Sequence, residues 1–254
     1  MKKLFLLAIT AGALFTSCKK NDEKAAGIYK GPETAVYHGK AWTWIQLNND
    51  GNPERMALSI DDAALNSVAV GTGTTGGEHH HDNNVVLKFH PKAAATIFNY
   101  VGLDWNPDGH PPVGIYDKPH FDFHFYMASP EETATYLDPV KLDASLPADY
   151  LPANYIGVDP VPAMGKHYVD VTSPELNGQL FTQTFIYGSY DAKLKFLEPM
   201  ITLDFLKATT SFERAVPQPA KYQKAGYYPT RMRIEKSNGV TNIILEGFVL
   251  RQAS

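Results

Sequence analysis

Cysteine is almost absent from this chain of 254 residues, and Cys18 is the only one. A disulfide framework is therefore excluded, so the protein must be held together by its hydrophobic core. The sequence also lacks a phosphate-binding P-loop, a GxSxG elbow, a GxGxxG fingerprint after a strand, and an HExxH helix. No local motif thus indicates a nucleotide-binding protein, an α/β-hydrolase or a zinc protease of the HExxH class.

Positive charge is scarce as well, with 23 Lys and Arg residues against 27 Asp and Glu residues. Removing residues 1–17 takes away Lys2 and Lys3 but no acids, which leaves 21 basic against 27 acidic residues and a net charge near −6. Such a balance argues against nucleic acid as a partner and against a basic face that lies on a membrane.

Long hydrophobic runs are limited to residues 4–15, which follow Lys2 and Lys3 and precede Thr16-Ser17-Cys18. This run is too short for a permanent membrane span and has the plan of a secretory signal peptide. A cysteine after small residues at the cleavage point resembles a bacterial lipobox, and acyl chains on Cys18 would anchor the protein to a membrane. Lipidation would also remove the only thiol from catalysis.

These features predict a lipoprotein in the cell envelope of a Gram-negative-type bacterium, on the periplasmic face or the outer surface. We expect a signal peptide at residues 1–17, a lipidated flexible tether at 18–36, and a single β-rich domain at 37–252. The tether begins with a charged run at residues 19–24 that has nothing to bury.

Alternating apolar and polar residues separated by tight turns predict most of the secondary structure. Hairpins are expected around residues 49–52, 188–191 and 237–239, the last being an Asn-Gly turn. The predicted fold class is α+β with β dominant: a mainly antiparallel sheet or barrel-like sandwich with a few short helices and long proline-rich loops. The sequence predicts irregular structure at residues 138–166, and a turn at residues 104–107 in which Asp and Asn side chains bond the backbone.

The most informative segment is Pro119-His120-Phe121-Asp122-Phe123-His124-Phe125-Tyr126. Side chains alternate between the two faces of a strand, so three phenylalanines should point into the core and His120, Asp122 and His124 should share the other face. His120 and His124 would have Cα atoms about 13 Å apart, too far to chelate one ion on a regular strand. His120 with Asp122, or Asp122 with His124, is the easier chelating pair.

A third ligand must come from elsewhere in the chain, and the candidates are His110, His167 and Glu198. Glu198 lies inside an apolar run, where a buried carboxylate needs a partner. Imidazole and carboxylate ligands suit a divalent Zn, Mn or Fe ion. The alternative is a hydrogen-bonded polar network that ties long loops to the sheet. The three adjacent histidines at 79–81 are a second, weaker metal candidate in a glycine-rich loop, and His38 and His90 are interpreted as structural or solvated.

The chain resembles a functionally uncharacterised family of bacterial exported proteins, defined by a domain of unknown function. The resemblance is carried by blocks that span most of residues 40–250, namely Leu103-Asp104-Trp105-Asn106-Pro107 with Gly109-His110, Pro119–Tyr126, Pro162–His167, Phe181–Gly188 and Phe196–Thr202. It implies secretion and self-association, and it supplies no catalytic role.

Three interpretations of function therefore remain open, and the sequence does not decide whether the protein is an enzyme. The first is a metal-binding envelope protein that uses the His, Asp and Glu cluster. The second is a β module whose aromatic residues line a pocket for a small apolar or sugar ligand. The third is a structural envelope protein that forms homo-oligomers.

Overall fold

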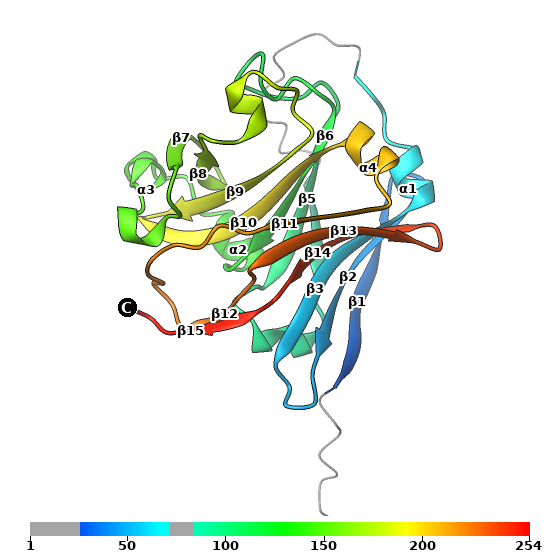
Figure 1. The fold of residues 1–254 in the computed structure, drawn as a ribbon, viewed down its shortest axis with the longest axis horizontal. Helices are drawn as coiled ribbons and strands as arrows, with labels where there is room; N and C mark the ends of the chain where they lie inside the picture. The colour runs from blue at the N-terminus through cyan, green and yellow to red at the C-terminus, as the bar shows by residue number, and fades with distance from the viewer. Residues whose placement is uncertain (1–25, 72–83) are drawn as a thin grey trace, which may run out of the picture.

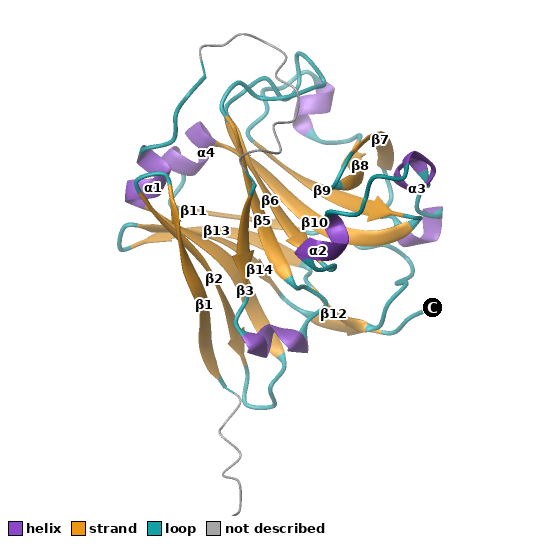
Figure 2. Ribbon diagram, turned by 180° about the vertical axis from the view of Figure 1, so that it is seen from behind, coloured by secondary structure: helices purple, strands orange, loops and turns teal. Residues whose placement is uncertain are grey.

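A computed structural model describes residues 26–71 and 84–254, and it shows two open antiparallel sheets packed face to face as a sandwich (Figures 1 and 2). The first sheet has six strands in the order β1-β2-β3-β14-β13-β11. Their bounds are β1 Gly27–Val36, β2 Gly39–Leu47, β3 Pro53–Asp61, β11 Ser211–Ala215, β13 Arg231–Ser237 and β14 Val240–Glu246.

The second sheet has seven strands in the order β4-β5-β6-β10-β9-β8-β7, and β12 pairs with β15 in a small third sheet. The bounds are β4 Val85–Lys88, β5 Tyr100–Asn106, β6 His120–Tyr126, β7 Tyr155–Val161, β8 Gly165–Asp170, β9 Gln183–Tyr190, β10 Lys193–Thr202, β12 Gly226–Tyr228 and β15 Val249–Arg251. The helices are short: α1 Asp62–Asn66, α2 Pro130–Thr133, α3 Pro139–Asp143 and α4 Leu203–Ala208, with 3-10 turns at Pro91–Ala95, Ala148–Tyr150 and Pro174–Asn177.

The main core lies between the two large sheets. Phe121, Phe123 and Phe125 of β6 are fully buried there and belong to one apolar cluster with Ile45 and Met56 of the facing sheet. Burial of large aromatic side chains is the dominant stabilising contribution in a sandwich that has no disulfide. The predicted inward face of the Pro119–Tyr126 segment is thus confirmed.

The β-dominant, antiparallel class predicted from the sequence is confirmed, and the sheets form a sandwich without closing into a barrel. The turns at residues 49–52 and 238–239 join antiparallel strands as expected. The turn expected at residues 188–191 lies at 191–192, because residues 188–190 still pair with β10 as the end of β9. Ser129 and Asp61 cap α2 and α1 through their side chains.

Two parts of the predicted organisation are wrong. The sequence places residues 27–36 in the flexible tether, but they form β1, which pairs with β2 along the edge of the first sheet. Most β1 side chains face solvent, so this strand lacks the hydrophobic alternation that identifies a half-buried strand. Residues 138–166 were expected to be irregular, but they contain α3, β7 and the start of β8; Pro160 lies in β7, which is an edge strand and tolerates proline. Cys18 and residues 79–81 lie outside the described residues.

Strand β6 lies between β5 and β10 inside the seven-stranded sheet, and every one of its residues is buried. Its polar face is therefore covered, whereas a solvated face would be expected of an ordinary half-exposed strand. No helix in the described part of the chain is both long and apolar enough to traverse a bilayer.

Candidate metal centre

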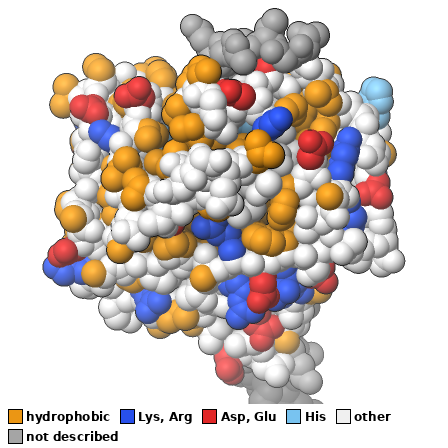
Figure 3. All heavy atoms as spheres, turned by 45° about the horizontal axis from the view of Figure 1, so that its top comes forward, with side chains coloured by type: hydrophobic (Ala, Val, Ile, Leu, Met, Phe, Trp, Pro, Cys, Tyr) orange, Lys and Arg blue, Asp and Glu red, His pale blue; other side chains and the backbone are white. Residues whose placement is uncertain are grey.

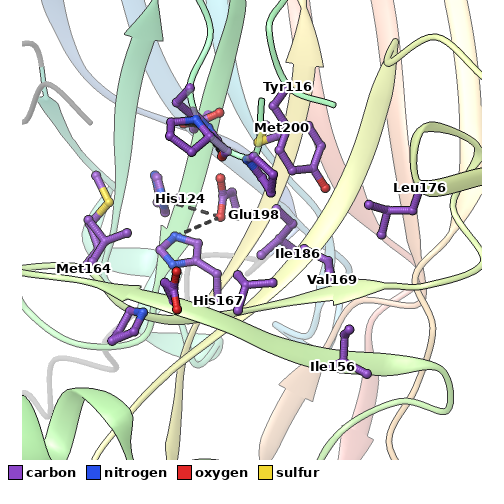
Figure 4. A pocket seen from close by; sticks show the side chains of 18 residues that line it. Tyr116, His124, Ile156, Met164, His167, Val169, Leu176, Ile186, Glu198 and Met200 are labelled. Atoms are coloured by element: carbon purple, nitrogen blue, oxygen red, sulfur yellow. Dashed lines mark hydrogen bonds and ion pairs between the residues drawn. The ribbon is translucent and has the colours of Figure 1, made fainter. Parts of the chain in front are cut away.

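The outer face of the seven-stranded sheet carries a cavity of about 410 Å³ (Figure 4). Its polar lining consists of side chains from the β5–β6 loop and from β6, β7, β8 and β10, namely His110, Asp122, His124, Asp159, His167 and Glu198. The other lining residues are all apolar or aromatic; in Figure 4 Ile156, Leu176 and Ile186 lie to one side of the histidines, and Met164 lies on the other. The cavity thus has a polar part formed by these ionisable side chains and an apolar part that includes Val169, Ile186 and Met200 of β8, β9 and β10.

The first group of possible ligands comprises His110, His120 and Asp122, all buried. His120 Nε2 lies 3.3 Å from Asp122 Oδ1, and His110 Nε2 lies 3.6 Å from Asp122 Oδ2. His110 reaches this position from the β5–β6 loop, where the His110 N–H donates to the Tyr116 carbonyl at 3.1 Å. Gly109 has a φ of +75° at the bend, and a Cβ there would collide with the backbone of Tyr116 and Asp117, so this bend requires glycine.

The second group comprises His124, His167 and Glu198, which come from β6, β8 and β10 and are also buried. Glu198 Oε2 lies 3.5 Å from His124 Nε2 and 3.6 Å from His167 Nε2, and Figure 4 shows both rings directed at this carboxylate. The Phe196 ring contacts both rings, with centroid distances of 5.1 Å to His124 and 5.0 Å to His167. Phe196 itself covers Gly188, where any Cβ would collide with the phenyl ring.

In three of the histidines the Nδ1 atom faces a protein oxygen, so that the Nε2 atom points towards the other ligand atoms. Nδ1 of His120 lies 2.6 Å from the Lys118 carbonyl, and Nδ1 of His110 lies 2.7 Å from the Pro111 carbonyl. A carbonyl only accepts, so each Nδ1 carries the proton. His124 Nδ1 lies 3.0 Å from Asp104 Oδ2. A ring nitrogen paired outward with a carbonyl or carboxylate is the arrangement typical of histidines that bind a metal through the other nitrogen.

Distances within each group match the spacing of ligands around an ion. Donor atoms bonded at about 2.1 Å in a tetrahedron lie about 3.4 Å from one another, and the four distances above range from 3.3 to 3.6 Å. Hydrogen bonds to carboxylates are shorter, about 2.7–2.9 Å. Within the part of the chain that the structure describes, four inward-facing atoms make no hydrogen bond although they are buried: His120 Nε2, Asp122 Oδ1, His124 Nε2 and Glu198 Oε2. Buried polar atoms without partners are costly, and a bound cation would satisfy them.

Burial and neighbouring charges shift the pKa values of the two carboxylates, Glu198 and Asp122, in opposite directions. Burial raises the pKa of Glu198 to about 8, an effect that the positive charge of His124 offsets only in part. Burial would lower the pKa of His124, but the negative charges of Glu198 and Asp104 outweigh it and raise the value to about 9. For Asp122, burial would raise the pKa, whereas His120 and His110 hold it well below its usual range. The second group therefore holds protons at neutral pH, while Asp122 is ionised.

All six predicted ligand residues meet at this one face, but they form two groups of three. His120 and His124 fall into different groups, as the expected Cα separation required. Asp122 pairs with His120, one of the two pairs considered, and His110, His167 and Glu198 each contribute to a group. His38 is exposed, and His90 accepts a hydrogen bond from the Lys92 N–H, so both have the structural or solvated roles expected of them.

Sequence reasoning missed Asp104 and Asn106, which were expected in a turn. They lie on β5, where Asp104 faces His124 and Asn106 Nδ2 donates to Asp122 Oδ2 at 2.8 Å. Leu103 and Trp105, which alternate with Asp104 and Asn106 along β5, point into the core. The same alternation that identified β6 was therefore present in β5, but the following proline and the Asp and Asn residues favoured a turn.

No family model, curated protein or solved structure matches this chain. The chemistry of the site must accordingly be inferred from its own residues. Each group supplies two imidazoles and one carboxylate, and these buried groups could hold a metal ion.

Proposed function

We propose that this protein binds two divalent transition-metal ions, one in each His₂-carboxylate group of the cavity. The observation that carries the proposal is the convergence of buried Nε2 and carboxylate oxygen atoms at 3.3–3.6 Å. Four of these atoms, His120 Nε2, Asp122 Oδ1, His124 Nε2 and Glu198 Oε2, make no hydrogen bond within the described residues. Two imidazoles with one carboxylate suit Zn²⁺ and Fe²⁺, and Mn²⁺ accepts the same donors. Three protein ligands would leave further coordination positions for water or a ligand.

A hydrogen-bonded polar network fits the geometry less well. In such a network the histidines would donate to the carboxylates at hydrogen-bonding distance, yet the facing atoms are separated by more than 3.2 Å. The outward nitrogens of His110 and His120, by contrast, lie within 2.7 Å of backbone carbonyl acceptors. The arrangement thus supplies good partners behind the rings and leaves the inward atoms for an ion.

Stoichiometry tests the proposal directly. Protein purified without a histidine tag, stripped with a chelator, reloaded with Zn²⁺ or Mn²⁺ and dialysed should retain two ions per chain by elemental analysis. His167→Ala should retain one, because its group loses a ligand, whereas His38→Ala, an exposed histidine, should retain both. All variants should also carry His79→Ser, His80→Ser and His81→Ser, which removes loose binding by that tract.

Metal binding to the folded state alone should also raise the free energy of unfolding, by about 2.7 kcal/mol for each site at a free concentration one hundred times its Kd. Protein that is metal-free after dialysis, with unchanged melting on adding Zn²⁺, Mn²⁺ or Fe²⁺, would contradict the proposal.

We further propose that the metal-binding domain is held in the cell envelope by a lipid on Cys18. Support comes from the lipobox-like context of residues 16–18 and from the lack of any other cysteine. In an expressing bacterium, Cys18→Ser should move the protein from the membrane fraction to the soluble fraction, because the acyl chains that give stable anchoring are lost. Ser17→Ala, which keeps a small residue before the cysteine, should stay with the membrane. A Cys18→Ser protein that still sediments with membranes would disprove the lipid anchor.

A further inference from the structure

The cavity extends beyond the two ligand groups, and its other wall is apolar. Val169, Ile186 and Met200 come from β8, β9 and β10 and pack together in a separate small apolar cluster on this outer face of the sheet. Ile156 and Val158 of β7 line the same space. In Figure 4 Ile156, Val169 and Ile186 stand to one side of the histidines. An ion alone needs no such compartment, and a volume of about 410 Å³ falls within the range of small-molecule pockets.

The cavity is connected to solvent at β7. Ile156 lines it and is nevertheless 53% exposed, and Asp159, which also lines it, is exposed. On the face shown in Figure 3, groups of hydrophobic side chains are interspersed with Lys, Arg, Asp and Glu side chains. A ligand could therefore reach the histidines at β7, past Ile156 and Asp159.

The net charge of the cavity with two metal ions bound determines which chemical group of a ligand it would accept. Two divalent ions bring four positive charges, against three negative charges on Asp104, Asp122 and Glu198. Asp159 is exposed, so solvent screens its charge from the ions. Excess positive charge in a buried, largely apolar space is unfavourable unless an anion compensates it. Open positions on Zn²⁺, Mn²⁺ or Fe²⁺ accept oxygen donors.

We infer that the metal-loaded cavity binds a small organic carboxylate, with its carboxylate oxygens on the ions and its hydrocarbon part against the apolar wall. This inference rests on the proposed metal binding and specifies the ligand class of the same site. The Tyr116 hydroxyl can donate a hydrogen bond to the bound carboxylate, because Tyr116 lines the cavity and its hydroxyl is buried without a hydrogen-bond partner within the described residues.

The test uses Co²⁺ as the loaded ion, because its visible absorption reports both its binding and any change in its ligands. Co²⁺-loaded protein is titrated with acetate, octanoate and octanamide. Octanoate should change the absorption and bind at least about tenfold more tightly than acetate, because its methylene groups are buried against the apolar wall. Octanamide, which has a similar chain without the charge, should bind at least about tenfold more weakly than octanoate. Metal-free protein should not bind octanoate measurably.

A pair of surface substitutions tests the location. Ile156→Asp places a negative charge at the rim and should weaken octanoate binding several-fold. Ile28→Asp changes an isoleucine on β1 that is 67% exposed and should have no effect. Both positions are exposed, so neither variant should unfold.

A failure of carboxylate binding can be distinguished from a failure of metal binding. If Co²⁺ binds but acetate and octanoate bind equally, or octanoate binds equally well without metal, the carboxylate inference is overturned while metal binding stands. If no Co²⁺ absorption develops at all, the metal proposal itself fails, and the inference fails with it.

Discussion

Glu198→Gln should lower the affinity of the second group for Zn²⁺ by at least about 100-fold, more than the 10- to 100-fold typical of losing an outer partner. The amide keeps the size of the side chain but cannot supply a negative oxygen between His124 and His167. Elemental analysis after dialysis should then give one ion per chain in place of two. Competition with a chromogenic chelator gives the affinity of the weakened site.

The same substitution should leave the metal-free protein folded, and this follows from the pKa of Glu198. Folding raises that pKa from 4.5 to about 8, so the folded state holds a proton that the unfolded state releases. The stabilisation is fully present below pH 4.5 and is lost as the pH rises towards 8. Glutamine does not ionise. Near pH 5 the variant and the parent should be equally stable, and towards pH 8 the variant should become the more stable of the two in EDTA.

Glu54→Gln is the matched control, because Glu54 is exposed on β3, in the sheet that does not carry the cavity. It should retain two ions and the stability of the parent at every pH. Two retained ions in Glu198→Gln would show that this carboxylate is not a ligand. A strong loss of metal-free stability at pH 5 would show that its role is structural.

The strands around the site show which parts of the fold can be predicted from the local sequence and which cannot. In β6, phenylalanine alternates with ionisable residues, so the strand and both of its faces could be derived from the period alone. In β1 most side chains are exposed, and in β7 only Tyr155 and Val161 are buried. These edge strands are defined by pairing with β2 and β8, which local alternation does not encode.

The ligand set was predictable, but its division into two groups was only partly so. Strand geometry already separated His120 from His124. The choice of third ligands depends on tertiary placement: His167 on β8 is joined to the β6 group through β9 and β10. The sequence did not identify Asp104 as part of the site, because Asp104-Trp105-Asn106-Pro107 also favours a turn. Only the pairing of β5 with β6 places the Asp104 carboxylate beside His124.

Asp122→Asn should have the opposite effect on the metal-free protein, a loss of about 3 kcal/mol in the free energy of unfolding at pH 6. Asp122 is buried and ionised, and its pKa is held well below 3.8 because His120 and His110 outweigh the effect of burial. Removing this charge leaves two buried imidazoles without their counter-ion, while the amide can still accept the Asn106 hydrogen bond. Denaturant titration in EDTA measures the loss, and elemental analysis should show that the first group no longer retains an ion.

The sign of the pH dependence distinguishes the two carboxylates. Because folding lowers the pKa of Asp122, its stabilisation is present above pH 3.8 and is lost as the pH falls through the lower folded value. The deficit of Asp122→Asn should therefore be present at pH 6 and shrink below pH 4. Asp149→Asn, which removes an exposed ion pair with Lys221, should cost less than about 1 kcal/mol. If Asp122→Asn were as stable as that control at pH 6, Asp122 would not be a paired buried charge. If both carboxylates behave as expected, Asp122 is ionised before the metal arrives, whereas Glu198 and His124 must release protons to bind it. Metal loading of the second group should therefore weaken more steeply as the pH falls.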